Sequence, residues 1–144
     1  MKPDWRMLAA VAIGGAIGSV ARFVLNAYMQ SRSSGPFPVG TLVINISGSA
    51  LLGFIMQFSL ETASVSPEIR VLLTTGFCGG FTTFSTFSYE TVKLVQDGEY
   101  GDAGLYVGSS VLLSLLGTAA GMQAAHRVVA SLRSRVPAKS AKEE

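Results

Sequence analysis

The chain has 144 residues, of which 49% are hydrophobic and 14% are charged, and its formal net charge is +2. Soluble domains carry about 25% charged residues, so this composition is typical of an integral membrane protein. The small net charge gives no reason to expect nucleic-acid binding. A single cysteine, Cys78, excludes an intrachain disulfide, and with a single histidine, His126, no metal cluster or nucleophile–base pair is visible, so we expect no enzyme.

Four segments carry few or no charges and are long enough to cross a bilayer, which takes about 20 apolar residues. They place the spans at about residues 7–29, 39–59, 70–95 and 103–126. We therefore expect an all-α integral membrane domain over about residues 1–132 and a polar C-terminal tail over residues 133–144. The first span is longer than the apolar region of a signal peptide, so we expect it to remain in the protein.

The third span differs from an ordinary membrane helix. Residues 76–89 read GFCGGFTTFSTFSY, and Gly76, Gly79 and Gly80 lie within five residues of one another. Glycine weakens a helix because it loses the most backbone entropy on ordering. Hydrocarbon offers no water to the freed backbone groups, so a broken helix is tolerated only where protein or a water-filled cavity covers it. The glycines predict a break, and the break indicates an ion site or a pore wall.

Uncharged polar residues accompany this break. Asn45 lies in the middle of the second span, and Tyr106, Ser110 and Ser114 share one face of the fourth because they recur every four residues. Hydroxyl-bearing residues follow the glycines at Thr82, Thr83, Ser85, Thr86 and Ser88. Such residues commonly bind membrane helices together. A path lined by amide and hydroxyl donors also suits a small anion, because the donors replace its lost water without trapping it.

Aromatic and charged residues near the break allow two interpretations each. Phe84 and Phe87 are three residues apart and so are neighbours on a helix. They either pack, or turn their positive ring edges toward a desolvated anion. Arg22 and Glu90 are the charges expected near membrane depth. Arg22 can reach the interface from the end of its span, whereas Glu90 either pairs with a basic residue or faces a vestibule.

Charge distribution bears on how the chain inserts. Four spans place both termini on one side, with eight basic residues there and three on the other side, which favours cytoplasmic termini. Without the C-terminal tail the counts are three and three, which permits both orientations. Four short helices enclose little interior, and small residues spaced by four, such as Gly14 and Gly18, let helices pack closely. We therefore expect an oligomer.

Three segments of the sequence closely resemble the Fluc (CrcB) family of fluoride channels, and the resemblance extends over about residues 8–126. The segments are residues 76–91, residues 40–45 (GTLVIN) and residues 14–22 (GGAIGSVAR). The resemblance implies passive export of cytoplasmic fluoride across the bacterial inner membrane. It implies an antiparallel, dual-topology homodimer with two pores. The resemblance also implies a set of fluoride-pore residues, namely Asn45, Phe84, Phe87, Glu90, Tyr106, Ser110 and Ser114, with Thr41 and Ser85 as weaker matches.

The same resemblance implies a structural sodium ion on the twofold axis, held by the backbone carbonyls of Gly79 and Thr82. Arg22 is expected in a vestibule or in a structural role. Two alternatives stay open. The basic tail would suit a heterodimer with an oppositely oriented paralogue. A proton-coupled exporter of the small multidrug resistance type also has four spans, but it needs an acid deep in a span, and Glu90 lies near the end of the third.

Overall fold

The computed structural model describes residues 4–33 and 35–135, and the regular structure of these residues is all helical. The long helices are α1 (Trp5–Gln30), α2 (Val39–Glu61) and α6 (Tyr100–Arg135). Within the described residues, these three are long and apolar enough to cross a membrane. They contain the predicted first, second and fourth spans. Helix α6 continues through Arg135, so the first three residues of the predicted tail are helical, and residues 136–144 lie outside the described part.

The predicted third span is divided among four short helices, none of which is long enough to cross a membrane by itself. They are α3 (Pro67–Val71), the π-helix η1 (Leu72–Cys78), α4 (Gly79–Phe81) and α5 (Phe84–Gln96). Between α4 and α5, Thr82 (φ −78°, ψ 160°) and Thr83 (φ −153°, ψ 120°) are extended. A break is therefore present, but its predicted position at the glycines is wrong, because the interruption follows them.

The glycines instead allow helix α1 to cross η1 and α4 closely. A Cβ atom on Gly80 would meet the carbonyl oxygen of Gly15, and one on Gly18 would meet the carbonyl oxygen of Phe77. No side chain fits between these backbones. This contact is of the small-residue kind that joins helices where no hydrophobic effect drives them together.

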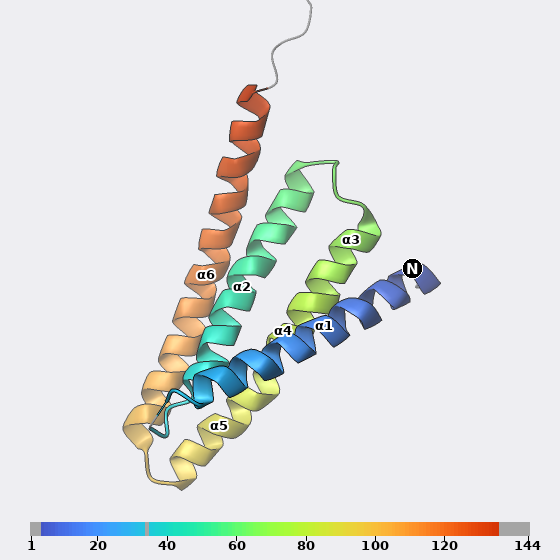
Figure 1. Ribbon diagram of the computed structural model, residues 1–144. Helices are drawn as coiled ribbons and strands as arrows, with labels where there is room; N and C mark the ends of the chain where they lie inside the picture. Colours follow the sequence, from blue (N-terminus) through green and yellow to red (C-terminus); the bar gives the residue numbers. More distant parts are fainter. Residues whose placement is uncertain (1–3, 34, 136–144) are drawn as a thin grey trace, which may run out of the picture.

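Two helix pairs organise the chain, as Figure 1 shows. Helix α2 packs along α6, where a Cβ on Gly121 would meet the carbonyl oxygen of Ala50. Helix α1 crosses the α3–η1–α4 segment. After α5 the chain reverses direction, and α5 packs against the first part of α6. The break between α4 and α5 thus faces the N-terminal half of α2, where Asn45 lies.

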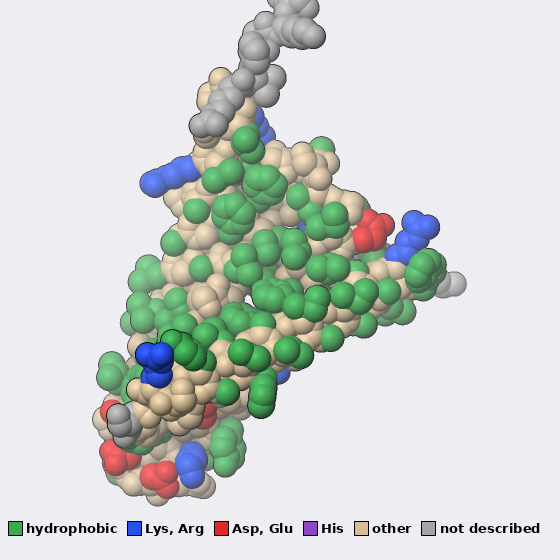
Figure 2. Space-filling model, in the orientation of Figure 1, with side chains coloured by type: hydrophobic (Ala, Val, Ile, Leu, Met, Phe, Trp, Pro, Cys, Tyr) green, Lys and Arg blue, Asp and Glu red, His purple; other side chains and the backbone are tan. Residues whose placement is uncertain are grey.

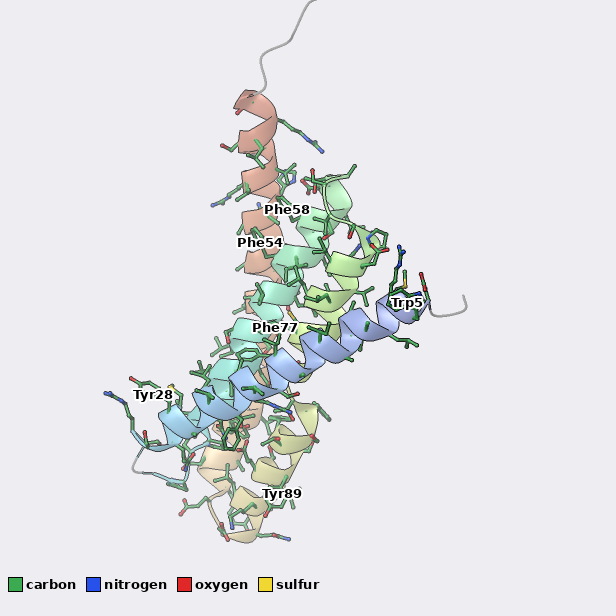
Figure 3. The ribbon with its side chains drawn as sticks, turned by 45° about the vertical axis from the view of Figure 1, so that its right-hand side comes forward. Trp5, Tyr28, Phe54, Phe58, Phe77 and Tyr89 are labelled. Atoms are coloured by element: carbon green, nitrogen blue, oxygen red, sulfur yellow. The ribbon has the colours of Figure 1, made fainter. Side chains whose placement is uncertain are left out.

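The outer surface is apolar along the helices and charged toward their ends (Figure 2). Large apolar side chains such as Ile17, Val20 and Leu112 are more than half exposed. Trp5 and Tyr28 lie near opposite ends of α1 (Figure 3) and are 70% and 52% exposed. Trp and Tyr are enriched at both membrane–water interfaces, so α1 presents the pattern of a spanning helix.

Candidate functional site

The main chain at the break is paired with a side chain of α2. The Asn45 Nδ2 atom donates to the Thr83 carbonyl oxygen at 3.0 Å, and the Thr83 N–H donates to Asn45 Oδ1 over an N–O distance of 2.8 Å. The Thr83 hydroxyl accepts from the Thr86 N–H (N–O 3.1 Å) and so begins α5 as its N-cap. An unpaired peptide group in hydrocarbon costs several kcal/mol, so these bonds make the break tolerable at this depth.

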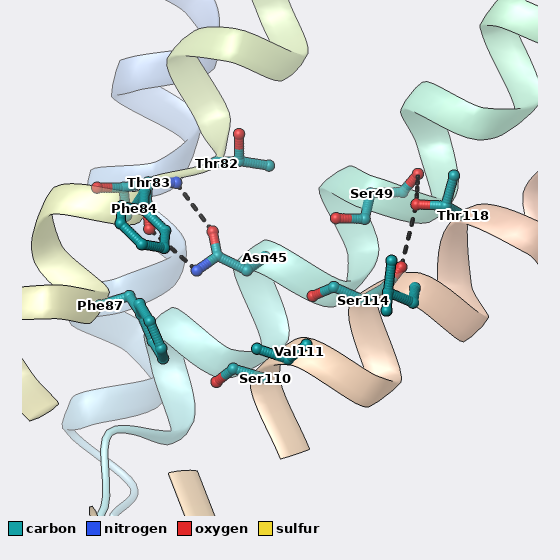
Figure 4. A pocket seen from close by; sticks show the side chains of 11 residues that line it. Asn45, Ser49, Thr82, Thr83, Phe84, Phe87, Ser110, Val111, Ser114 and Thr118 are labelled. Atoms are coloured by element: carbon teal, nitrogen blue, oxygen red, sulfur yellow. Dashed lines mark hydrogen bonds between the residues drawn. The ribbon is translucent and has the colours of Figure 1, made fainter. Parts of the chain in front are cut away.

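A cavity of about 350 Å³ lies beside the break, between α2, α5 and α6 (Figure 4). It is lined by five of the predicted pore residues, namely Asn45, Phe84, Phe87, Ser110 and Ser114. None of its lining residues is charged. The structure therefore brings together, from three helices, hydroxyl and amide donors and a pair of aromatic rings around one space.

The Ser110 hydroxyl lines this cavity and is buried without a hydrogen-bond partner within the described residues. The residue as a whole is 6% exposed. Buried polar side chains nearly always have a partner, and each exception calls for an explanation such as an ion. Ser110 is thus a free donor and acceptor inside the cavity wall.

The two phenylalanines line the cavity from α5. Their ring centroids are 5.4 Å apart, with the ring planes tilted by 43°. Phe84 is 79% exposed in the single chain, whereas Phe87 is half-buried against Tyr106, with centroids 5.2 Å apart. The rings are close enough to act on one small ion, and one side of Phe84 is left open.

Glu90 is held by hydroxyl groups and not by a basic residue. The Thr41 hydroxyl donates to one carboxylate oxygen at 3.0 Å, and the Tyr106 hydroxyl donates to the other at 2.8 Å. Neither of the two ion pairs among residues 4–33 and 35–135 includes Glu90. Tyr106 is fully buried and contacts Phe87, so it connects this carboxylate to the cavity wall.

A second cavity, of about 330 Å³, lies on the other side of Thr83. Arg22 and Thr41 line it, together with Asn26 of α1, which the sequence analysis missed. Ser49 and Thr118, which line the first cavity, were also missed. Their spacing was the available signal, because Ser49 follows Asn45 and Thr118 follows Ser114 by one helical turn.

Ser85 lines neither cavity. Its side chain is exposed, and its hydroxyl lies 3.2 Å from the Thr83 hydroxyl. Gly79 is exposed as well, and a Cβ atom there would meet only the Thr74 carbonyl oxygen, at 3.9 Å. Among the described residues, no group of three His, Cys, Asp or Glu side chains is placed to hold a metal.

The chain is similar to known proteins over most of its length. Residues 9–122 match the family described as CrcB-like protein, Camphor Resistance (CrcB). A protein of Geobacter sulfurreducens is 50% identical over 121 residues, which cover 84% of this chain and 98% of the relative. One from Geobacter metallireducens is 45% identical over the same shares, and one from Rhizobium meliloti is 43% identical over 78% of this chain and 90% of its own length.

All three relatives are named fluoride-specific ion channel FluC. That name describes an ion channel and not an enzyme, as the sequence analysis predicted. The family match covers well over half of the chain, and its residues include the break and both cavities. The chain therefore belongs to the CrcB family of multi-pass membrane proteins, as its sequence resemblance indicated.

Proposed function

We propose that this protein is a fluoride channel through which cytoplasmic fluoride leaves a bacterial cell passively across the inner membrane. The observation that supports this most strongly is the cavity of about 350 Å³ at the helix break, whose lining has donors and aromatic rings but no charge. The names of the relatives support the same ion.

Conduction requires binding that is strong enough to draw the ion in and weak enough to release it. The hydroxyls of Ser110 and Ser114 and the free N–H of Asn45 would replace part of the hydration shell of fluoride. The positive edges of Phe84 and Phe87 would add attraction without a fixed charge.

The pathway is completed by a second copy of the chain. Phe84 is 79% exposed beside an open cavity, and the nearby Gly79 is exposed, although both lie at membrane depth in the third predicted span. We propose four spans per subunit and an antiparallel, dual-topology homodimer with two pores, in which the partner covers this face. A heterodimer with an oppositely oriented paralogue would cover it in the same way.

The break also fits a structural sodium ion held by backbone oxygens. In an unbroken helix the Gly79 carbonyl would accept from the Thr83 N–H, which here donates to Asn45. The Thr82 carbonyl would accept from the Thr86 N–H, which here donates to the Thr83 hydroxyl. Both carbonyls have thus lost their helical donors. Carbonyl oxygens at broken membrane helices suit a small hard cation, which would neutralise their dipoles.

A proton-coupled exporter of the small multidrug resistance type is the alternative. It would use a deep acid that exchanges a proton for a cationic substrate. Glu90 lies near the end of the third predicted span, and both of its oxygens accept hydrogen bonds from hydroxyls. Both oxygens are thus already engaged by hydroxyls of the protein, and this favours the channel over the exporter.

The proposal is tested by fluoride efflux from liposomes that contain the purified full-length protein. With valinomycin clamping the voltage through potassium, we expect rapid fluoride release and little chloride release from matched vesicles. Efflux should not depend on an imposed proton gradient. Strict dependence on that gradient, or equal fluoride and chloride rates, would contradict a passive fluoride channel.

A further inference from the structure

We infer that Asn45 is a positioning residue, which holds the break between α4 and α5 in one conformation and acts on the transported ion through that segment. Asn45 lines the cavity, so its amide was expected to contact the ion directly. The hydrogen bonds indicate a different main task, because both ends of the carboxamide bind the main chain of a single residue, Thr83.

The two bonds select the extended conformation of Thr83. At φ −153° and ψ 120°, the N–H and C=O groups of Thr83 point to the same side of the chain, as they do in a β-strand. One carboxamide can then bind both groups, in the way that a neighbouring strand residue does. In a helix the N–H and C=O of one residue point in opposite directions along the axis, so the same side chain cannot reach both.

These two hydrogen bonds also use much of the hydrogen-bonding capacity of the Asn45 side chain. A carboxamide has two N–H donors and one oxygen acceptor with two lone pairs. Thr83 takes one donor at 3.0 Å and one lone pair, over an N–O distance of 2.8 Å. A single N–H is left for an ion in the cavity. Direct coordination by Asn45 is therefore the smaller part of its role.

The neighbouring turn of α2 is shaped for the same segment. Gly48 is buried, three residues after Asn45, and a Cβ atom there would meet the Thr82 side chain and the Phe81 ring. Asn45 and Gly48 thus contact the break from the same part of α2. Helix α5 begins at Phe84, directly after Thr83, so the conformation that Asn45 holds sets the direction in which the Phe84 and Phe87 rings project.

A matched set of variants separates this role from that of an ion ligand. Asn45→Leu keeps a similar volume and removes both bonds to Thr83. Ser47→Ala removes an exposed hydroxyl of α2 that bonds only to carbonyls of its own helix, and serves as the control. Asn45→Asp is the informative variant. Its protonated carboxyl can donate to the Thr83 carbonyl and accept from the Thr83 N–H, whereas its carboxylate cannot donate.

The measurement is the NMR resonance of the Thr83 amide proton in the full-length protein in lipid nanodiscs, beside fluoride efflux. We expect Asn45→Leu to move this resonance upfield and to lower efflux at least tenfold, and Ser47→Ala to change neither. In Asn45→Asp the resonance should match the parent at acidic pH and the Leu variant once the carboxyl ionises. The parent should show no such titration.

A parental Thr83 resonance in Asn45→Leu, or in ionised Asn45→Asp, would overturn the inference. If the Leu variant does not fold, the titration of Asn45→Asp decides alone. The effect on efflux rests on the proposed fluoride pathway, but the Thr83 resonance does not. A parent that carries no fluoride would therefore refute the proposed function, while the resonance would still report on Asn45.

Discussion

Replacing Ser110 by alanine should stabilise the fold and impair transport at the same time. The Ser110 hydroxyl is buried without a partner, and such a group costs about 1–3 kcal/mol of stability. Alanine removes this cost and is also the better helix former. We expect Ser110→Ala to raise the free energy of unfolding by about 1 kcal/mol or more.

The same change removes a donor from the proposed pathway. A hydrogen bond to a charged partner contributes about 1.5–3 kcal/mol, and each 1.4 kcal/mol is a factor of ten. If this hydroxyl binds fluoride at the rate-limiting point of the pathway, its loss should lower the efflux rate about 10- to 100-fold. Stability and transport would thus change in opposite directions, which is the mark of a residue kept for function.

The assay is equilibrium unfolding in mixed micelles, followed by efflux from liposomes at equal protein density. Ser109→Ala is the matched control, since the Ser109 hydroxyl donates to the Tyr106 carbonyl of its own helix at 3.3 Å. It shares the gain in helix propensity but should leave efflux unchanged. Loss of stability in Ser110→Ala, or parental efflux, would refute the reasoning that this hydroxyl is reserved for an ion.

The remaining predictions concern the rings, the carboxylate and the helix crossing. Phe84→Ile and Phe87→Ile keep apolar bulk but remove the ring edge, so each should strongly reduce fluoride efflux. Both variants should still elute as a dimer on size exclusion. Parental efflux in both variants would show that the rings serve only in packing. Tyr106→Phe removes the 2.8 Å hydrogen bond to the Glu90 carboxylate and should lower the free energy of unfolding by about 1–3 kcal/mol. An unchanged free energy of unfolding would contradict this prediction. Gly18→Ala should cost about 1–3 kcal/mol because its Cβ would meet a backbone carbonyl, whereas Gly104→Ala, with open space, should cost nothing in the same unfolding assay.

Much of the candidate site was predictable because it depends on helical periodicity. Ser110 and Ser114 were placed on one face from their spacing, and the structure puts both in the cavity wall with Asn45. The interruption of the third span was predicted from its glycines, but those glycines are helical. Gly79 has φ −65° and ψ −35°, so it needs no unusual backbone freedom.

Composition and hydropathy are enough to predict the membrane class and the approximate helices, because an apolar run of sufficient length has few alternatives to a spanning helix. The position of the break in the third span, by contrast, follows from contacts between helices. That position depends on Asn45, 38 residues away in the chain, whose carboxamide pairs with Thr83. Packing between helices also explains why Glu90 binds the Thr41 and Tyr106 hydroxyls and not a basic residue. Hydrogen bonds between side chains of different helices depend on how the helices pack, so the periodicity within one helix does not predict them.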